Sequence, residues 1–290
     1  MRWSAPGKLV LLGDYAVLEG ARALVAAVDR RAVGRVDAEG PRTEVVEAVL
    51  ARARAEGAGV DGVRIDTAGF LEPGGQKLGI GSSAAVAVVT AALARGRGDE
   101  LTFEVALEGH RDAAGGVGSG VDLAASFYGG IVACRRQPAP VDVLPSRIRG
   151  LHLTVVWAGE SASTSQLVRA CRKAETWSRW MEIMTGLAEE GISAWAKGDR
   201  SRFLSVVARY GRAMAGLGRD AGVPVVTDTI SAVLEQAEIL GAAAKPSGAG
   251  GGDVVVIFSE SAEVGLEAAA RAGVRVIDLA IDPQGLRREP

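Results

Sequence analysis

The chain has 290 residues, of which 48% are hydrophobic and 23% are charged. This balance is typical of a folded globular protein and excludes a disordered tail, a coiled coil and a collagen-like rod. The 33 Lys and Arg residues against 35 Asp and Glu residues give a formal net charge of -2, so no overall positive field would attract nucleic acid or anionic lipid.

The first half of the sequence predicts short strands and helices separated by glycine turns. We expect strands over 8–12, 23–29, 31–36, 63–66 and 130–134, with 31–36 at a sheet edge, and helices over 44–54, 84–93, 103–114 and 122–127. Ser82 or Ser83 is the expected N-cap of the helix at 84–93, because a serine oxygen accepts bonds from the first N–H groups of a helix. Three prolines within 137–145 predict a linker between two domains.

The second half predicts longer helices and a few strongly apolar strands. Strands are expected over 151–157, 254–258 and 274–280, and helices over 166–196, 201–218, 229–240, where Asp228 is the expected cap, and 263–272. Strands and helices mix in both halves without strict alternation. We therefore expect an α+β fold in two lobes, 1–145 and 146–290.

Signals for export, disulfides and metal clusters are weak. Cys134 and Cys171 are too few for a disulfide framework, and His110 and His152 make a histidine-built metal centre improbable. The N-terminus has no long apolar stretch, and the apolar run at 84–94 is too short to span a bilayer. A cytoplasmic protein with no membrane or nucleic-acid partner is the expectation, and the oligomeric state stays open.

Glycine loops are the most distinctive feature of the sequence. Three of them, at 79–83, 115–120 and 248–252, lie beside predicted strands or helices. Bare glycine N–H groups and the positive end of a helix together favour an anion, and phosphate is the usual one. The 79–83 loop opens onto a predicted helix and so has both parts, although an ordinary loop with a serine cap has the same pattern. The common nucleotide-binding signatures, a Walker loop and a dinucleotide fingerprint, are absent from the sequence.

Three motifs in order resemble those of the GHMP small-molecule kinases. They are APGKLVLLGDYAVLE at Ala5–Glu19, KLGIGSSAA at Lys77–Ala85 and KPSGAGGGD at Lys245–Asp253, and together they span nearly the whole chain. The resemblance implies a two-lobed α+β GHMP kinase fold with the active site between the lobes. It also implies phosphoryl transfer from ATP with Mg²⁺.

Within this family the chain is most similar to the phosphomevalonate kinases. The likeness rests on the third motif, GGVGSGVD at 115–122, the loop at 161–165 and AGVPV at 221–225. It implies transfer of the γ-phosphoryl group of ATP to 5-phosphomevalonate, giving 5-diphosphomevalonate and ADP in isoprenoid precursor synthesis. The alternatives are another member such as mevalonate kinase or a diphosphomevalonate-decarboxylase-like enzyme, and a non-catalytic nucleotide- or metabolite-binding homologue.

The resemblance also implies roles for particular residues. Lys8 would neutralise charge near the transferred phosphate, unless it is only a solvated lysine, and Asp122 matches the catalytic acid residue of mevalonate kinase, unless it only caps a helix. A phosphate acceptor, with a second pKa of about 6, hardly needs a base, so Asp122 would then orient Lys8 or help to hold the metal. The residues implied for ATP are Lys77, Gly79, Gly81, Ser82, Ser83 and Ala84, with Ser83 also contacting Mg²⁺.

A phosphorylated small-molecule acceptor needs cationic and hydroxyl partners beside ATP. The residues implied for it are His110, Arg111, Ser119, Gly120, Ser163, Thr164, Ser247, Gly248 and Gly250, and Lys77 is a further candidate. Two departures from the family pattern stand out. The first is His110, which lies near the place where mevalonate kinase has a Mg²⁺-binding Glu. A neutral imidazole is a poor ligand for Mg²⁺, so His110 disfavours mevalonate kinase. Glu108, Asp112 or water could take the place of that Glu as a Mg²⁺ ligand. The second departure is that the segment 40–76, which lies between the first two motifs, is short.

Overall fold

The chain folds into two compact units, each built from separate stretches of sequence. The computed structural model describes residues 1–37, 40, 42–71, 74–116, 118–145, 148–159 and 163–290. Unit 1 contains Met1–Leu9, Val25–Val143 and Ala280–Pro290, and unit 2 contains Val10–Leu24 and Leu144–Leu279. The division expected at 145/146 differs from these units in residues 10–24, 144–145 and 280–290. Within the described part, every helix is too short or too polar to traverse a lipid bilayer.

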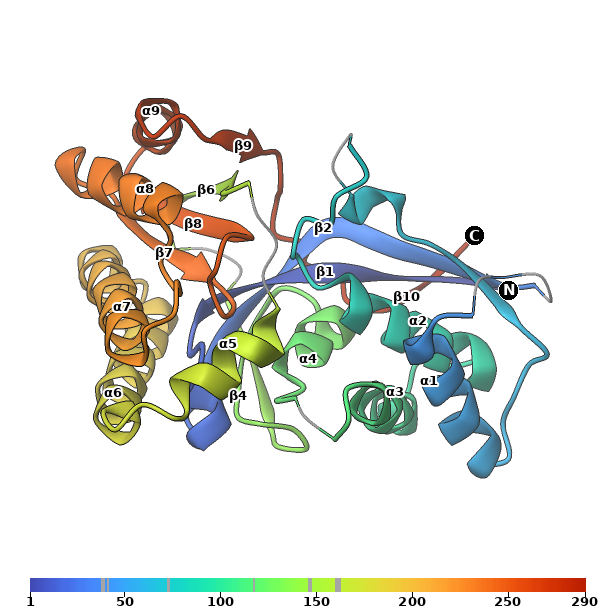
Figure 1. The fold of residues 1–290 in the computed structure, drawn as a ribbon. Helices are drawn as coiled ribbons and strands as arrows, with labels where there is room; N and C mark the ends of the chain where they lie inside the picture. Colours follow the sequence, from blue (N-terminus) through green and yellow to red (C-terminus); the bar gives the residue numbers. More distant parts are fainter. Residues whose placement is uncertain (38–39, 41, 72–73, 117, 146–147, 160–162) are drawn as a thin grey trace. The chain divides into compact units, whose positions relative to one another are not determined.

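A six-stranded sheet organises unit 1 (Figure 1). Its strands are β1 (Arg2–Leu12), β2 (Ala23–Val36), β3 (Val63–Asp66), β4 (Ile131–Cys134), β5 (Val141–Leu144) and β10 (Arg287–Glu289), in the order β10-β1-β2-β4-β5 with β3 also beside β2. The expectation of an edge strand at 31–36 is wrong, because β3 pairs with Val33–Val36 and β1 lies on the other side of β2. The proline-rich segment 137–145, expected as a linker, contains both the short strand β5 and the boundary between the units.

Unit 1 has four helices that pack on one another. They are α1 (Glu44–Ala55), α2 (Ser82–Arg95), α3 (Glu100–Ala113) and α4 (Val121–Tyr128), with short 3-10 turns at Ala16–Glu19 in unit 2 and Ala68–Phe70 in unit 1. Two of the four helices, α2 and α4, contact strands of the unit 1 sheet. Thr43 and Asp99 cap α1 and α3 by accepting the N–H groups of Val46 and Thr102. Gly34 of β2 lets α2 approach closely, because a Cβ there would lie 2.5 Å from Val89 Cγ1.

Unit 2 contains a four-stranded antiparallel sheet with both faces covered. Its strands are β6 (His152–Trp157), β7 (Ala243–Ser247), β8 (Val254–Ser259) and β9 (Arg275–Ile277), in the order β7-β8-β6-β9. Val255 and Ile257 share a buried cluster with α8 (Asp228–Ile239) and α9 (Ala262–Arg271), whereas Phe258 packs edge-on against Phe203. Burial on both faces explains why β8 is apolar at successive positions.

The helix expected over 166–196 is two helices, α5 (Thr164–Cys171) and α6 (Trp177–Lys197). Between them the N–H groups of Lys173, Ala174 and Trp177 each bond the carbonyl three residues earlier, which tightens the turn. No glycine or proline marks this break. The following helix, α7 (Arg200–Ala221), was expected, but α8 is capped by Thr227 rather than Asp228. The strand expected over 274–280 is only Arg275–Ile277, and β7 and β10 were not expected.

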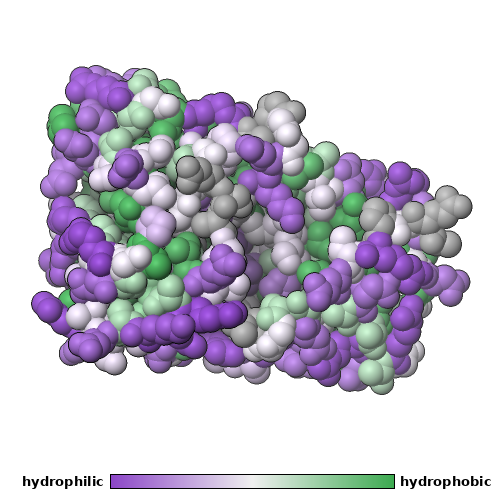
Figure 2. All heavy atoms as spheres, in the orientation of Figure 1, coloured by the Kyte–Doolittle hydropathy of each residue, from purple (hydrophilic) through white to green (hydrophobic). Residues whose placement is uncertain are grey.

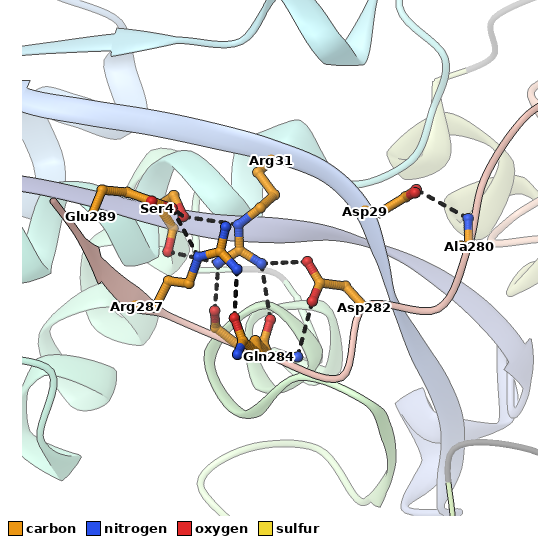
Figure 3. A network of polar contacts seen from close by, with 9 residues as sticks. Ser4, Asp29, Arg31, Ala280, Asp282, Gln284, Arg287 and Glu289 are labelled. Atoms are coloured by element: carbon orange, nitrogen blue, oxygen red, sulfur yellow. Dashed lines mark hydrogen bonds and ion pairs between the residues drawn. The ribbon is translucent and has the colours of Figure 1, made fainter.

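The last eleven residues return to unit 1 and are held there by Arg31 of β2 (Figure 3). The Arg31 guanidinium forms an ion pair with Asp282 and donates to the carbonyls of Gln284 at 2.9 Å and Gly285 at 2.6 Å. It also donates to the Ser4 hydroxyl at 2.8 Å, so one side chain joins β1, β2 and the C-terminal segment. The side chains of Arg31 and Asp282 are each only 10% exposed, and burial of this kind makes an unpaired partner costly.

Replacing Arg31 by Met should therefore lower the free energy of unfolding by about 3 kcal/mol, because Asp282 would be left buried without a cation. Urea denaturation measures this change. The matched control is Arg271→Met, which breaks the exposed Arg271–Glu267 pair and should change stability by less than about 0.5 kcal/mol. Equal effects of the two substitutions would contradict a stabilising role of the buried Arg31–Asp282 ion pair.

Candidate active site

Lys8 lies against the 79–83 loop within unit 1. The backbone N–H of Lys8 donates to the carbonyl of Ile80 at 2.8 Å. Gly81 has a φ of +84°, and a Cβ there would lie 2.6 Å from Lys8 Cγ, so the lysine stem runs over a position that only glycine leaves open. Among the described residues, the Lys8 ammonium lies beyond 4.0 Å from every carboxylate oxygen, that of Asp122 included. The Lys8 side chain thus lies beside the start of the helix that follows the loop.

The first turn of α2 has no side-chain cap. Its N-cap is Gly81, in the left-handed region, so the expectation that Ser82 or Ser83 caps the helix is wrong. Both serines and Ala84 lie inside the first turn, where backbone N–H groups have no partner within the helix. Gly79, with a φ of +75°, precedes this turn, and Lys77 is exposed at its entrance. Uncapped N–H groups at a positive helix end can donate hydrogen bonds to a phosphate.

His110 contacts the start of α2 from the last turn of α3. Its Nε2 lies 3.0 Å from the Ser83 hydroxyl oxygen. Ser83 is exposed and His110 is half-buried. The structure thus joins one residue expected to bind Mg²⁺ and one expected to bind the acceptor.

A second group of expected residues surrounds the start of α4, which packs against α2. Gly120, with a φ of +75°, is the N-cap of α4, and Asp122 lies in the first turn, where its carboxylate accepts the N–H of Leu123 at 3.0 Å rather than capping the helix. The Ser119 carbonyl accepts the N–H of Gln137 at 2.8 Å. Arg111 donates to the Gln137 carbonyl and pairs with Glu108 at 3.1 Å, so its guanidinium is engaged within the protein. In the 115–120 loop, Val117 lies outside the described residues.

The third motif is tied to the first within unit 2 by a buried ion pair. The Asp14 carboxylate lies 2.7 Å from the Lys245 ammonium, and the two side chains are 1% and 0% exposed. The same carboxylate accepts the N–H of Gly248 at 2.6 Å, and Lys245 also donates to the Val10 carbonyl at 3.2 Å. Burial raises the pKa of Asp14, while Lys245 and the Gly248 N–H act to lower it.

The other expected residues of the third motif differ in how much space surrounds them. The Ser247 hydroxyl accepts the N–H of Val10 at 2.9 Å, and Gly250 packs directly on the Val225 carbonyl, so both have structural contacts. Gly248, with a φ of +90°, has open space where a side chain would lie. Tyr15, which has an unusual φ of +59°, donates to the Ala249 carbonyl at 2.6 Å. The main chain at Gly248 is the part of this loop left open to a ligand.

Ser163 and Thr164 begin α5 and are exposed. The Ser163 and Ser165 hydroxyl oxygens lie 3.2 Å apart, and no side chain caps this helix. Residues 161 and 162 of the expected acceptor loop lie outside the described part of the chain.

Metal binding was tested on the side chains present. Across the described ranges, no three His, Cys, Asp or Glu residues gather where they could ligate an ion. A magnesium ion carried on phosphate groups needs only one or two protein ligands. The Ser83 hydroxyl and the Asp122 carboxylate, each in the first turn of a helix, are oxygen donors of the required kind. The uncapped start of α2 and the adjacent Lys8 likewise fit phosphate oxygens.

Comparison with known proteins gives a consistent result. Residues 43–130 match the family described as GHMP kinases N terminal domain. The phosphomevalonate kinase of Streptomyces sp. (strain CL190) is 30% identical over 86% of this chain and 87% of its own, and the mevalonate kinase of Aeropyrum pernix is 30% identical over 99% and 98%. The structure of Streptococcus pneumoniae phosphomevalonate kinase with phosphomevalonate and AMPPNP matches with a TM-score of 0.82 at 20% identity, covering 97% of this chain and 99% of that one.

Sequence reasoning missed the partners of Asp14 and Lys245, although it quoted both residues within motifs. A charged residue two positions after the apolar run 9–12 was the available signal, because burial there requires a counter-charge. The identity of that counter-charge depends on the fold, since the two residues lie far apart in sequence.

Replacing Lys245 by Met should lower the free energy of unfolding by about 3–5 kcal/mol at pH 7, because Asp14 loses its buried partner. Without the ammonium, burial raises the Asp14 pKa further above its ordinary 3.8. A raised pKa in the folded state gives stability that is present below pH 3.8 and is lost as the pH rises. The deficit measured by urea unfolding should thus be larger at pH 7 than at pH 4.

The double variant Asp14→Asn/Lys245→Met should be more stable than the single one at pH 7, because no charge is left buried. Arg212→Met, which breaks an exposed pair with Glu238, is the control and should change stability little. A deficit for Lys245→Met that grows towards pH 4 would contradict the assignment.

Proposed function

The chain belongs to the GHMP kinase family and is a phosphotransferase, and on that basis we propose that it transfers the γ-phosphoryl group of ATP to 5-phosphomevalonate, giving 5-diphosphomevalonate and ADP. Similarity to phosphomevalonate and mevalonate kinases assigns it to the mevalonate pathway. The observation that carries the phosphoryl-transfer part is the position of Lys8 over Gly81, beside the uncapped first turn of α2.

The 79–83 loop and the start of α2 bind the phosphates of ATP in this proposal. The N–H groups of Ser82, Ser83 and Ala84 donate to phosphate oxygens, and the glycines at 79 and 81 keep side chains away from them. Lys77 is exposed just before the loop, and in this proposal its ammonium attracts the nucleotide. Mg²⁺ bound to ATP offsets phosphate charge, and Ser83 is its expected protein ligand.

Lys8 is the residue that stabilises charge during transfer. No carboxylate lies within 4.0 Å of its ammonium among the described residues, so its charge is available to a phosphoryl group. Asp122 holds a different role with each possible acceptor. An alcohol has to lose a proton, which a carboxylate can take, whereas a phosphate with a second pKa of about 6 is already ionised at neutral pH.

The acceptor is assigned to 5-phosphomevalonate on two grounds. The 30% identity to a phosphomevalonate kinase over 86% of this chain supports it. His110 supports it too, because it lies near the place where mevalonate kinase has a Mg²⁺-binding Glu, and an imidazole is a poor ligand for Mg²⁺. We propose that Ser119, Ser163, Thr164 and the Gly248 main chain bind the acceptor. Three other expected residues contact the protein itself: Arg111, Ser247 and Gly250. We propose that they hold the acceptor-binding residues in place and do not bind the acceptor themselves.

The decisive experiment is an ADP-release assay of the purified protein with ATP and Mg²⁺ against a panel of acceptors. We expect 5-phosphomevalonate to be used with a kcat/KM at least about 100-fold above that of mevalonate, because a site built for a charged group rejects the analogue that lacks it. Preference for mevalonate would identify the alternative kinase. Release of phosphate and CO₂ with diphosphomevalonate would indicate a decarboxylase, and ATP binding without turnover would indicate a non-catalytic homologue.

The Asp122→Asn variant separates the acceptors independently. With a phosphate acceptor its kcat should fall by less than about tenfold, because no proton has to be removed. Lys8→Met is the control and should lose about 100-fold or more in kcat, as expected when a charge-stabilising donor is removed. A loss for Asp122→Asn as large as that for Lys8→Met would contradict a phosphate acceptor.

A further inference from the structure

The last turn of α3 is fastened to its neighbours at four successive residues. Gly109 packs on α1 so closely that a Cβ would lie 2.5 Å from Val49 Cα. His110 then contacts Ser83 of α2, and Arg111 donates to the Gln137 carbonyl. Asp112 accepts two bonds from the Arg52 guanidinium of α1, at 2.5 and 2.8 Å. The backbone that carries His110 is therefore held by α1 and by the Gln137 carbonyl.

Ser83 occupies a place where its hydroxyl has several possible directions. It is exposed in the first turn of α2 and does not cap the helix. A hydroxyl has one proton and two lone pairs, and it can use either kind of group towards a neighbour. If the proton points at His110 Nε2, 3.0 Å away, both lone pairs are left for a cation. If Nε2 instead carries a proton and donates to Ser83, one lone pair of the hydroxyl is used and only one is left for a cation.

We propose that His110 is a positioning residue that orients the Ser83 hydroxyl towards the metal ion of a bound nucleotide. In this arrangement Nε2 accepts a hydrogen bond from the Ser83 hydroxyl, and the ring itself touches neither the metal nor the acceptor. This reassigns His110 from the acceptor-binding role expected from the sequence. It rests on the proposed function only in requiring that a metal–nucleotide complex binds at the start of α2.

Outer partners of metal ligands act in this way in other sites, and their loss commonly weakens metal binding 10- to 100-fold. The neighbouring tether gives a contrast within the same turn. The Arg52–Asp112 pair is exposed, with side chains 46% and 44% accessible, and it does not contact Ser83. Removing this pair loosens the turn but leaves the His110 ring, which accepts the hydrogen bond from Ser83. It therefore distinguishes an effect of Ser83 orientation from an effect of the rigidity of the turn.

The test is calorimetric titration of the full chain with AMPPNP, in Mg²⁺ and in EDTA, without any acceptor. For His110→Ala we expect the Kd in Mg²⁺ to rise about tenfold and the Kd in EDTA to stay within about twofold of the parent. His110→Gln, whose amide oxygen also accepts a hydrogen bond, should recover most of the lost affinity in Mg²⁺. The double variant Ser83→Ala/His110→Ala should bind no more weakly than Ser83→Ala, because the two residues act as one unit.

Arg52→Ala is the control and should leave both Kd values within about twofold of the parent. The inference is overturned if His110→Ala weakens binding equally in EDTA, if its effect adds to that of Ser83→Ala, or if Arg52→Ala matches it. Failure of the proposed acceptor has a different signature, since the parent protein would then bind AMPPNP with Mg²⁺ but would not phosphorylate 5-phosphomevalonate.

Discussion

A single backbone hydrogen bond, from the N–H of Lys8 to the carbonyl of Ile80, fixes the candidate site of unit 1. It holds β1 beside the 79–83 loop, so the Lys8 side chain has to run over Gly81. Gly81 has no side chain to obstruct Lys8, and it is also the N-cap of α2, in a left-handed conformation. The first turn of α2 is therefore left without a side-chain cap. An ammonium and free N–H groups thus meet at one helix end, where a negative group is stabilised.

The third motif shows how much of a glycine-rich loop is structural. In unit 2 the Asp14–Lys245 pair and the Ser247 hydroxyl join the loop to the first motif through contacts within the protein. A buried pair of this kind is weak evidence for stability, because desolvation opposes the attraction. Its clearer effect is to hold the Gly248 N–H in one direction, and it leaves the open face of that glycine as the part available for binding.

Local patterns predicted most of the secondary structure, and non-local contacts explain where they did not. The strand at 63–66 has the expected bounds because alternation and flanking glycines are local signals. The break after α5, the left-handed start of α2 and the return of the C-terminal segment to Arg31 are set by packing partners distant in sequence. The candidate site shows the same difference between local and non-local signals. The motifs predicted Lys8, Gly81 and Ser83 as site residues. The hydrogen bond between Ser83 and His110 and the partner of Asp14 could be found only from the fold.

The most direct test of the anion site at the start of α2 is nucleotide binding by Gly81→Ala, measured with AMPPNP and Mg²⁺. An added Cβ would lie 2.6 Å from Lys8 Cγ and would strain a φ of +84°, so Lys8 and the loop have to move apart. The matched control is Gly96→Ala at the other end of α2, where φ is +70° and the nearest atom lies 3.8 Å away. We predict that Gly81→Ala weakens binding by about 100-fold or more and that Gly96→Ala changes it by less than about threefold. Equal binding by the two folded variants would contradict the account.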